Sequence, residues 1–314
     1  MSTAEKEREW DASRLADLTG QITPEISKIV TSYTKVGEVS LFHYTDQSGF
    51  LGIIKNSELW ASDLRHMNDT TEIAYGVGLW RRAVIERTKQ EDDDEVKQIL
   101  ALSLRLGFIM PVPAMPSTHA VCFCRSPAVL SQWRHYARSD GYVLEFDSEE
   151  LLDKTTARSG QVHVSLGNVI YSQSTQSALV ASVIEKICLW LKSKDFMTVP
   201  AKDRLQIGPA LLHGVCVSTA AFLKSPIYEP ELECRLFAAP VPLGSVDALD
   251  FRSSDSGLVP YVKLVSKAPH LPIRRVHLGP SHHLESKQSS AQLVLRRFGY
   301  MDTEIVDSGL VGER

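Results

Sequence analysis

The chain lacks both the long apolar run and the leader that would direct it to a membrane or out of the cell. No stretch of its 314 residues approaches the roughly 20 apolar residues that a helix needs to cross a bilayer. The first ten residues, MSTAEKEREW, are polar and rich in acidic side chains, whereas a signal peptide has a basic start and an apolar middle. We therefore expect a cytoplasmic protein without membrane contacts.

Paired cysteines and an excess of basic charge are also missing. The cysteine count is odd and no CxxC pair occurs, which excludes a zinc ribbon and gives no support to a disulfide framework. We expect five reduced thiols, at Cys122, Cys124, Cys188, Cys216 and Cys234. The formal charge of −4, from 34 basic and 38 acidic residues, argues against a general nucleic-acid coat protein but leaves room for a local basic groove.

The common catalytic motifs are absent as well. There is no Walker loop, no GxGxxG after a strand, no HExxH and no GxSxG, which removes the commonest nucleotide-binding, metalloprotease and hydrolase classes. The ten histidines are mostly scattered rather than set at ligand spacing, so we expect no metal site. With 43% hydrophobic and 23% charged residues, the chain can still bury a sizeable core.

Apolar spacing predicts a mixed fold. Residues 1–36 should form an N-terminal helical arm, and residues 37–310 a single domain, because no linker interrupts them. Strand candidates and helices do not alternate regularly, which favours α+β over a doubly wound parallel sheet. Strands are expected at 39–44, 59–62, 118–124, 142–147, 161–171, 233–239, 261–265, 274–279 and 303–308. Gly279 and Pro280 should end a strand and turn the chain into a helix near residue 284.

Three segments concentrate unusual polar and aromatic residues. LFHYT at 41–45 places His43 and Tyr44 near a strand end beside a helix start, where backbone N–H groups and a polar ring suit an anionic ligand. The alternative is a structural histidine. In SPAVLSQWRHYA at 126–137, a helix would make Trp133 and Tyr136 neighbours, and the Arg134 guanidinium suits a phosphate or a carboxylate. The alternative is a core tryptophan beside a structural ion pair.

The third segment is YEPELECRLF at 228–237. If the strand begins at Glu231, then Glu231, Glu233 and Arg235 share one face, because side chains alternate along a strand. A guanidinium beside two carboxyl groups favours their charged form. This arrangement suits a catalytic carboxylate that must stay ionised next to a cationic intermediate. The alternative is an exposed strand face with ordinary ion pairs.

Five pieces together resemble a bacterial family, the domain of unknown function 2971. In order they are LFHYTDQSGFLGII, LWASDLRHMNDTTE, CFCRSPAVLSQWRHYA with GYVLEFD, ECRLF and VHLGP, and they cover nearly all of the chain after the N-terminal arm. The polar residues Arg65, Asn68 and Asp69 belong to the second piece.

LFHYT and ELECR are also similar, more remotely, to the first and last elements of the ADP-ribosyltransferase-like fold. That resemblance implies a split, twisted, mostly antiparallel sheet with surrounding helices, and NAD as substrate. It implies that His43 holds a ribose, and that Glu233 or Glu231 stabilises the nicotinamide ribose while its bond breaks. The remaining NAD contacts would come from Tyr44, Arg65, Trp133, Arg134, Tyr136 and Arg235.

The implied function is an NAD-dependent ADP-ribosyltransferase, acting as a toxin or phage-defence effector on a protein or nucleic-acid acceptor, with an antitoxin or another protein as partner. The alternative is a non-catalytic nucleotide- or partner-binding module on the same fold, and a third class is a nucleic-acid-processing enzyme. The enzyme requires His43 and Glu231 or Glu233 to line one cleft, which the binding module does not. For the enzyme, Glu233→Gln should lower NAD cleavage by about 100-fold or more and hardly change folding.

Overall fold

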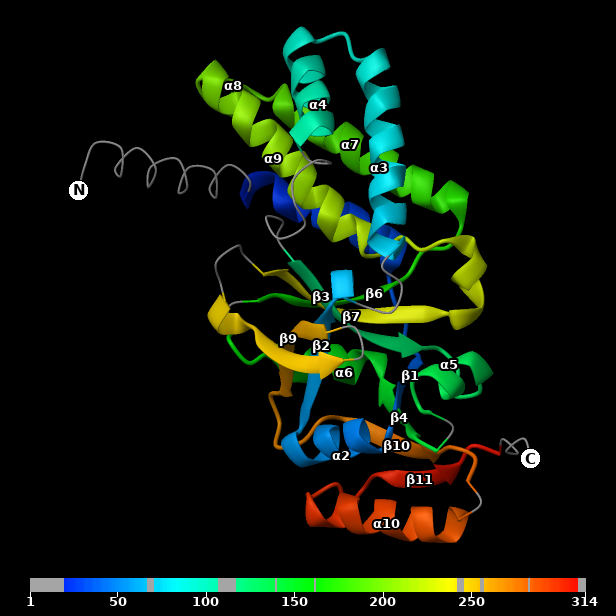
Figure 1. Cartoon of the computed structure of the whole chain (residues 1–314). Coiled ribbons are helices and arrows are strands. Elements are labelled where there is room, and N and C mark those ends of the chain that lie inside the picture. The colour runs from blue at the N-terminus through cyan, green and yellow to red at the C-terminus, as the bar shows by residue number, and fades with distance from the viewer. Residues whose placement is uncertain are drawn as a thin grey trace, which may run out of the picture. The chain divides into compact units, whose positions relative to one another are not determined.

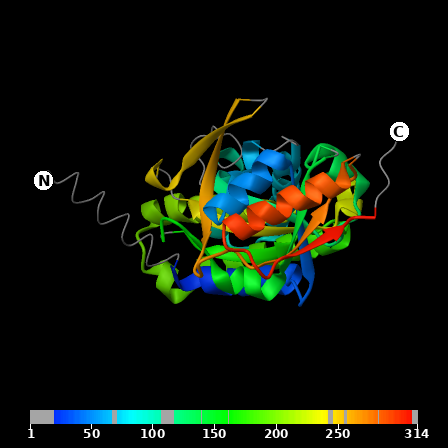
Figure 2. The ribbon, with the colours of Figure 1, turned by 90° about the horizontal axis from the view of Figure 1, so that it is seen from below.

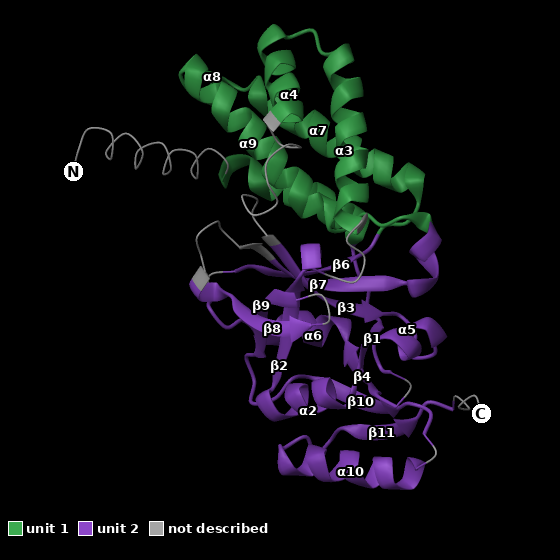
Figure 3. Ribbon diagram, in the orientation of Figure 1, with its two compact units in different colours: residues 1–34, 70–116, 170–226 green, residues 35–69, 117–169, 227–314 purple. Residues whose placement is uncertain are grey.

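The computed structural model describes residues 20–66, 71–106, 117–138, 140–160, 162–241, 246–254, 257–281 and 283–309. They form two compact units, one helical and one built on a sheet (Figure 3). The helical unit takes its described residues from segments 1–34, 70–116 and 170–226, and the sheet unit takes the rest. This division differs from the expected arm and single domain, because the helix over residues 20–34 buries Ile22 and Ile26 in the core of the helical unit.

The helical unit is an assembly of amphipathic helices around one apolar cluster. Besides the helix over residues 20–34, it contains α3 (Thr71–Gln90), α4 (Asp94–Leu106), α7 (Gln173–Leu191), α8 (Lys194–Met197) and α9 (Ala201–Ala220). A Cβ atom added to Gly76 of α3 would lie 2.8 Å from the Cβ of Ala220, so these two helices meet almost backbone to backbone. No helix among the described residues has the length and apolar character needed to cross a membrane.

The sheet unit confirms the predicted mixture of helices with a mostly antiparallel, open sheet. Its strands are β1 (Ser40–Thr45), β2 (Glu58–Asp63), β3 (Ser117–Cys124), β4 (Tyr142–Asp147), β5 (Thr155–Ala157), β6 (Val164–Asn168), β7 (Glu233–Val241), β8 (Asp250–Ser254), β9 (Gly257–Ser266), β10 (Ile273–Leu278) and β11 (Glu304–Asp307). Its helices are α2 (Gln47–Asn56), α5 (Leu130–His135), α6 (Ser148–Lys154) and α10 (Leu284–Arg297), with 3₁₀ turns η1 (Leu64–His66), η3 (Pro226–Glu231) and η4 (Val246–Ala248).

Strand β3 is the branching point of the sheet (Figure 1). Along one edge it pairs with β7 over nearly its whole length. The other edge is shared: β2 pairs with Ala120 and His119 near the start of β3, and β1 pairs only with Cys124 at its end. Two groups of strands therefore join the same edge of β3 at different points. One group runs β1-β4-β10-β11 and the other runs β2-β9-β5, so the sheet forks at β3. Strands β8 and β9 form a hairpin at the far side (Figure 2).

The two faces of the sheet differ in character. On the apolar face, core side chains such as Leu41, Phe123 and Leu236 pack with residues of α2, α6 and α10. The other face, which we call the polar face, receives the alternate side chains of the same strands. It carries the smaller apolar cluster around Phe42 and most of the buried polar groups of these strands. Buried examples are Glu145, Glu233, Arg235 and His277, and the partly buried Ser40 donates a hydrogen bond to Glu145.

The VHLGP piece ends β10 as predicted, and α10 begins at Leu284. A Cβ atom on Gly279 would lie 2.6 Å from the Trp133 ring, so only glycine lets the chain pass α5 here. The buried Lys287 ammonium donates to the carbonyls of Gly141 (2.9 Å) and Gly279 (3.2 Å). This cation therefore joins the start of β4 to the end of β10.

Candidate functional site

The Glu233–Arg235 pair lies at the start of β7, on the polar face. Arg235 Nε donates to Glu233 Oε1 at 2.8 Å and Nη2 donates to Oε2 at 2.9 Å, a bidentate arrangement. Arg235 is 0% exposed and Glu233 is 7% exposed. Both carboxylate oxygens of the favoured catalytic residue thus accept hydrogen bonds from a buried guanidinium. The alternative of an exposed strand face with ordinary ion pairs is wrong, because these side chains lie in the interior.

Glu231 does not share this face in the predicted way. It ends the 3₁₀ turn η3, and β7 begins only at Glu233. Between them, Leu232 has a φ of 46°, in the left-handed region. The expectation that strand alternation extends back to Glu231 is therefore wrong, because the chain changes conformation at Leu232.

His43 lies in the fork between β1 and β3. Its ring packs against Phe123 on the apolar face, with centroids 5.6 Å apart. Its Nδ1 is 3.0 Å from the carbonyl oxygen of Cys122, on the part of β3 where β1 offers no strand pairing. Burial lowers the pKa of His43, against the hydrogen bond to the carbonyl. A neutral ring that donates from Nδ1 therefore hydrogen-bonds this carbonyl inside the fork.

His43 and Glu233 point to opposite faces of the sheet. Phe42, Cys124 and Glu233 form one row of paired residues across β1, β3 and β7. Because successive side chains alternate, His43 points away from the side on which Phe42 and Glu233 lie. The prediction that His43 and Glu233 line one cleft is wrong, since strand alternation separates them although they are only two strands apart.

Tyr44 and Trp133 hold the segment that leads into α5. The Tyr44 hydroxyl donates to the Ser126 carbonyl at 2.8 Å and accepts from the Val129 N–H at 3.0 Å. Trp133 Nε1 donates to the Pro127 carbonyl at 2.8 Å, and the two rings meet edge to face at 5.4 Å. Both side chains are buried, and burial raises the pKa of the Tyr44 hydroxyl. This arrangement is the core alternative for Trp133, whereas Arg134 and Tyr136 on the same helix are exposed.

Arg65 clamps a buried carboxylate at the end of β2. Its Nε is 2.9 Å from Asp63 Oδ1, its Nη2 is 2.5 Å from Oδ2, and its backbone N–H donates to Oδ1. Burial would raise the pKa of Asp63, but the hydrogen bonds from Arg65 hold it below its ordinary value. The neighbouring Asn68 and Asp69 lie outside the described residues.

Sequence reasoning missed His119, the cross-strand partner of Asp63. It is 0% exposed, and neither ring nitrogen has a hydrogen-bond partner in the part of the chain that the structure describes. Burial lowers its pKa to about 4, with Asp63 acting in the opposite direction. A buried polar group without a partner is costly and often marks a functional position. No sequence signal distinguishes it, because THAVCFC has the composition of a buried strand.

A second missed group joins two of the family pieces on the polar face. Glu145, in GYVLEFD, accepts hydrogen bonds from Ser40 Oγ at 2.8 Å and pairs with His277 Nε2, in VHLGP, at 2.8 Å. Burial would raise the pKa of Glu145, but these bonds and the nearby Arg275 guanidinium lower it overall. The carboxylate of Glu145 in the otherwise apolar strand YVLEFD was the available signal.

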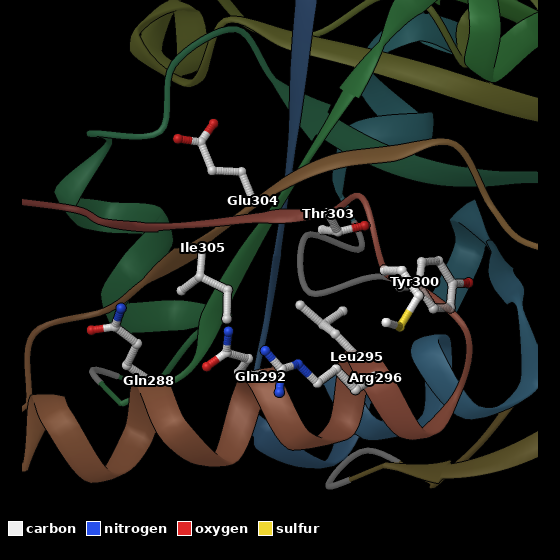
Figure 4. A pocket seen from close by; sticks show the side chains of 9 residues that line it. Gln288, Gln292, Leu295, Arg296, Tyr300, Thr303, Glu304 and Ile305 are labelled. Atoms are coloured by element: carbon white, nitrogen blue, oxygen red, sulfur yellow. The ribbon is translucent and has the colours of Figure 1, made fainter.

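The described residues also border a cavity of about 340 Å³ between α10 and β11 (Figure 4). None of the predicted site residues lines it. Its walls are Gln288, Gln292, Leu295, Arg296, Tyr300, Met301, Thr303, Glu304 and Ile305. Within the same described ranges, no three metal-ligating side chains are grouped so that they could hold an ion.

Residues 132–236 match a family model described as Protein of unknown function (DUF2971). The match runs from α5 to the middle of β7, so it includes Trp133, Glu145, Glu233 and Arg235 but not His43. It confirms the predicted resemblance to this family over that segment. No curated protein and no solved structure matches the chain.

We predict that Glu233→Gln lowers the free energy of unfolding by about 3–5 kcal/mol, because it leaves a buried guanidinium without its carboxylate. This replaces the expectation of nearly unchanged folding. Chemical denaturation measures the loss. The double variant Glu233→Met with Arg235→Met removes both charges and should recover most of it. A single-variant loss below about 1 kcal/mol, the value of an exposed ion pair, would contradict the buried pair.

We also predict a pH dependence at His119. Its folded pKa of about 4 lies below the ordinary 6.5, so the unfolded chain binds a proton in this window that the folded protein does not. The free energy of unfolding should therefore fall as the pH falls from 6.5 to 4, by about 3 kcal/mol for this group. His119→Leu should remove that part of the slope while leaving the part due to His43. Equal slopes in both proteins would contradict the assignment.

Proposed function

We propose that the chain is a nucleotide- or partner-binding module that uses an ADP-ribosyltransferase-like sheet without cleaving NAD. The observation that carries the proposal is the separation of His43 from Glu233 on opposite faces of the sheet. A small ligand held against one face meets the groups on that face. The ribose and the bond to be broken would therefore not meet both residues together.

The charge around Glu233 supports the same proposal. Cleavage of the N-glycosidic bond develops positive charge on the ribose, and a carboxylate lowers that barrier through its uncompensated negative charge. Glu233 is in bidentate contact with Arg235, so the pair carries no net charge. Its field at a neighbouring ribose is that of a dipole rather than of an anion. The pair is therefore better suited to stabilising the interior of the sheet than to catalysing bond cleavage.

One observation favours the second candidate, an NAD-dependent ADP-ribosyltransferase. Strands β1, β3 and β7 are adjacent and antiparallel, and β1 leaves β3 at the fork. A split sheet with a histidine on an early strand and a glutamate at the start of a late one is what the ADP-ribosyltransferase resemblance implies. Glu231, outside the strand, would then be the catalytic carboxylate. The acceptor, a toxin or defence role and an antitoxin partner would follow only with this candidate.

Incubation with NAD separates the two candidates. For the binding module we expect heat of binding in calorimetry, but no release of nicotinamide above the protein-free rate and no transfer of adenine label to protein or nucleic acid. Glu231→Gln should leave binding unchanged. Nicotinamide release that Glu231→Gln abolishes would overturn the proposal in favour of the transferase. Absence of any binding would overturn its nucleotide form.

A further inference from the structure

The open part of the polar face carries a tryptophan that is fixed in place yet exposed. Trp60 of β2 stacks on Tyr261 of β9, with ring centroids 4.5 Å apart and planes inclined by 22°. Its Nε1 donates to Glu58 Oε1 at 2.9 Å. The side chain nevertheless remains 41% exposed, whereas Tyr261 beneath it is 5% exposed. One face of the indole is therefore covered by Tyr261, and the ring is held without any need to order it on binding.

Three cationic side chains either pair with Trp60 across the sheet or contact its neighbours on the same strand. Arg158 Nη2 contacts Glu58 Oε2 at 2.8 Å, and Lys263, the residue paired with Trp60 across β2 and β9, contacts Asp250 at 3.0 Å. Arg252 Nη2 donates to the neutral Ser62 hydroxyl at 3.2 Å. Three cations and two carboxylates leave a net positive charge beside the ring. Arg158 is itself more than half exposed, so its remaining N–H groups face solvent.

We propose that this Trp60 platform binds the base of a nucleotide, with the phosphate groups meeting Arg158, Arg252 or Lys263. The inference rests on the proposed nucleotide-binding function and gives it a location. A rigid aromatic face beside cations suits a ligand that combines a planar ring with an anion, because bases stack on such rings and guanidinium groups bind phosphate oxygens. A neutral sugar would use the ring but not the charge.

The location differs from the one expected from sequence. Tyr136, which follows the last residue of α5, was an expected NAD contact and is 40% exposed, nearly the same as Trp60. Tyr136 therefore provides a control matched in exposure and in aromatic character. The comparison between the two positions decides where a bound base lies.

The test is calorimetric titration with ATP, adenosine and ribose 5-phosphate on the parent protein and on four variants. Trp60→Ala should weaken ATP and adenosine binding by roughly 10- to 100-fold, the range expected for loss of one base stack. Tyr136→Ala should leave both unchanged. Arg252→Gln should weaken ATP and ribose 5-phosphate but not adenosine. Thermal melting of each variant shows whether it is folded, and Trp60→Phe, which keeps a stacking ring, should retain most of the affinity.

ATP binding that Trp60→Ala leaves unchanged would overturn the platform while the proposed nucleotide-binding function stands. Loss of binding in Tyr136→Ala instead would move the base to α5. Absence of ATP and adenosine binding in the parent protein would overturn the platform, whatever the NAD titration gives. Equal weakening by Trp60→Ala and Trp60→Phe would also contradict stacking, because the phenylalanine ring should replace part of it.

Discussion

Strand alternation around β3 is the constraint on which the arrangement of polar residues depends. Because β3 pairs with β7 on one edge and with both β1 and β2 on the other, its register fixes the faces of four strands at once. Glu233 and Arg235 lie on the polar face as a consequence, and His43 turns the other way to satisfy the carbonyl of Cys122 in the fork. His43 and Glu233 are thus separated by the thickness of the sheet.

The buried polar groups follow from the same constraint. A face that receives alternate side chains from buried strands must pair any charge it carries, since an unpaired buried charge costs several kcal/mol or more. Glu233 has Arg235, and Glu145 has His277 and Ser40. His119 lies on the opposite, apolar face with Phe123, and among the described residues neither of its ring nitrogens has a hydrogen-bond partner. Burial lowers the pKa of His119, so its ring is neutral in the folded protein and the free energy of unfolding depends on pH.

Much of the fold could be predicted from the sequence, because strands such as YVLEFD and THAVCFC are short apolar runs with clear boundaries. The turn at Gly279 was predictable for the same local reason. The strand β8 was missed, since DFRSS has neither an apolar run nor a clean alternation. The division into two units was also missed, because the helical unit is assembled from three separated segments and only tertiary packing unites them. Which face a side chain occupies depends on register, and local patterns do not contain it.

The surroundings of Trp60 were likewise not predictable from local sequence patterns. LWAS was predictable as a strand, yet nothing in those residues indicates that Tyr261 lies under the indole or that Arg158 and Lys263 flank it. The most direct test of the division between the two faces is to map backbone amide shifts by nuclear magnetic resonance while ATP is added. The account predicts that the largest changes fall on β2, β8 and β9, with His43 and Glu231 unaffected. Coupled changes at His43 and Glu231, with none at Trp60, would contradict it.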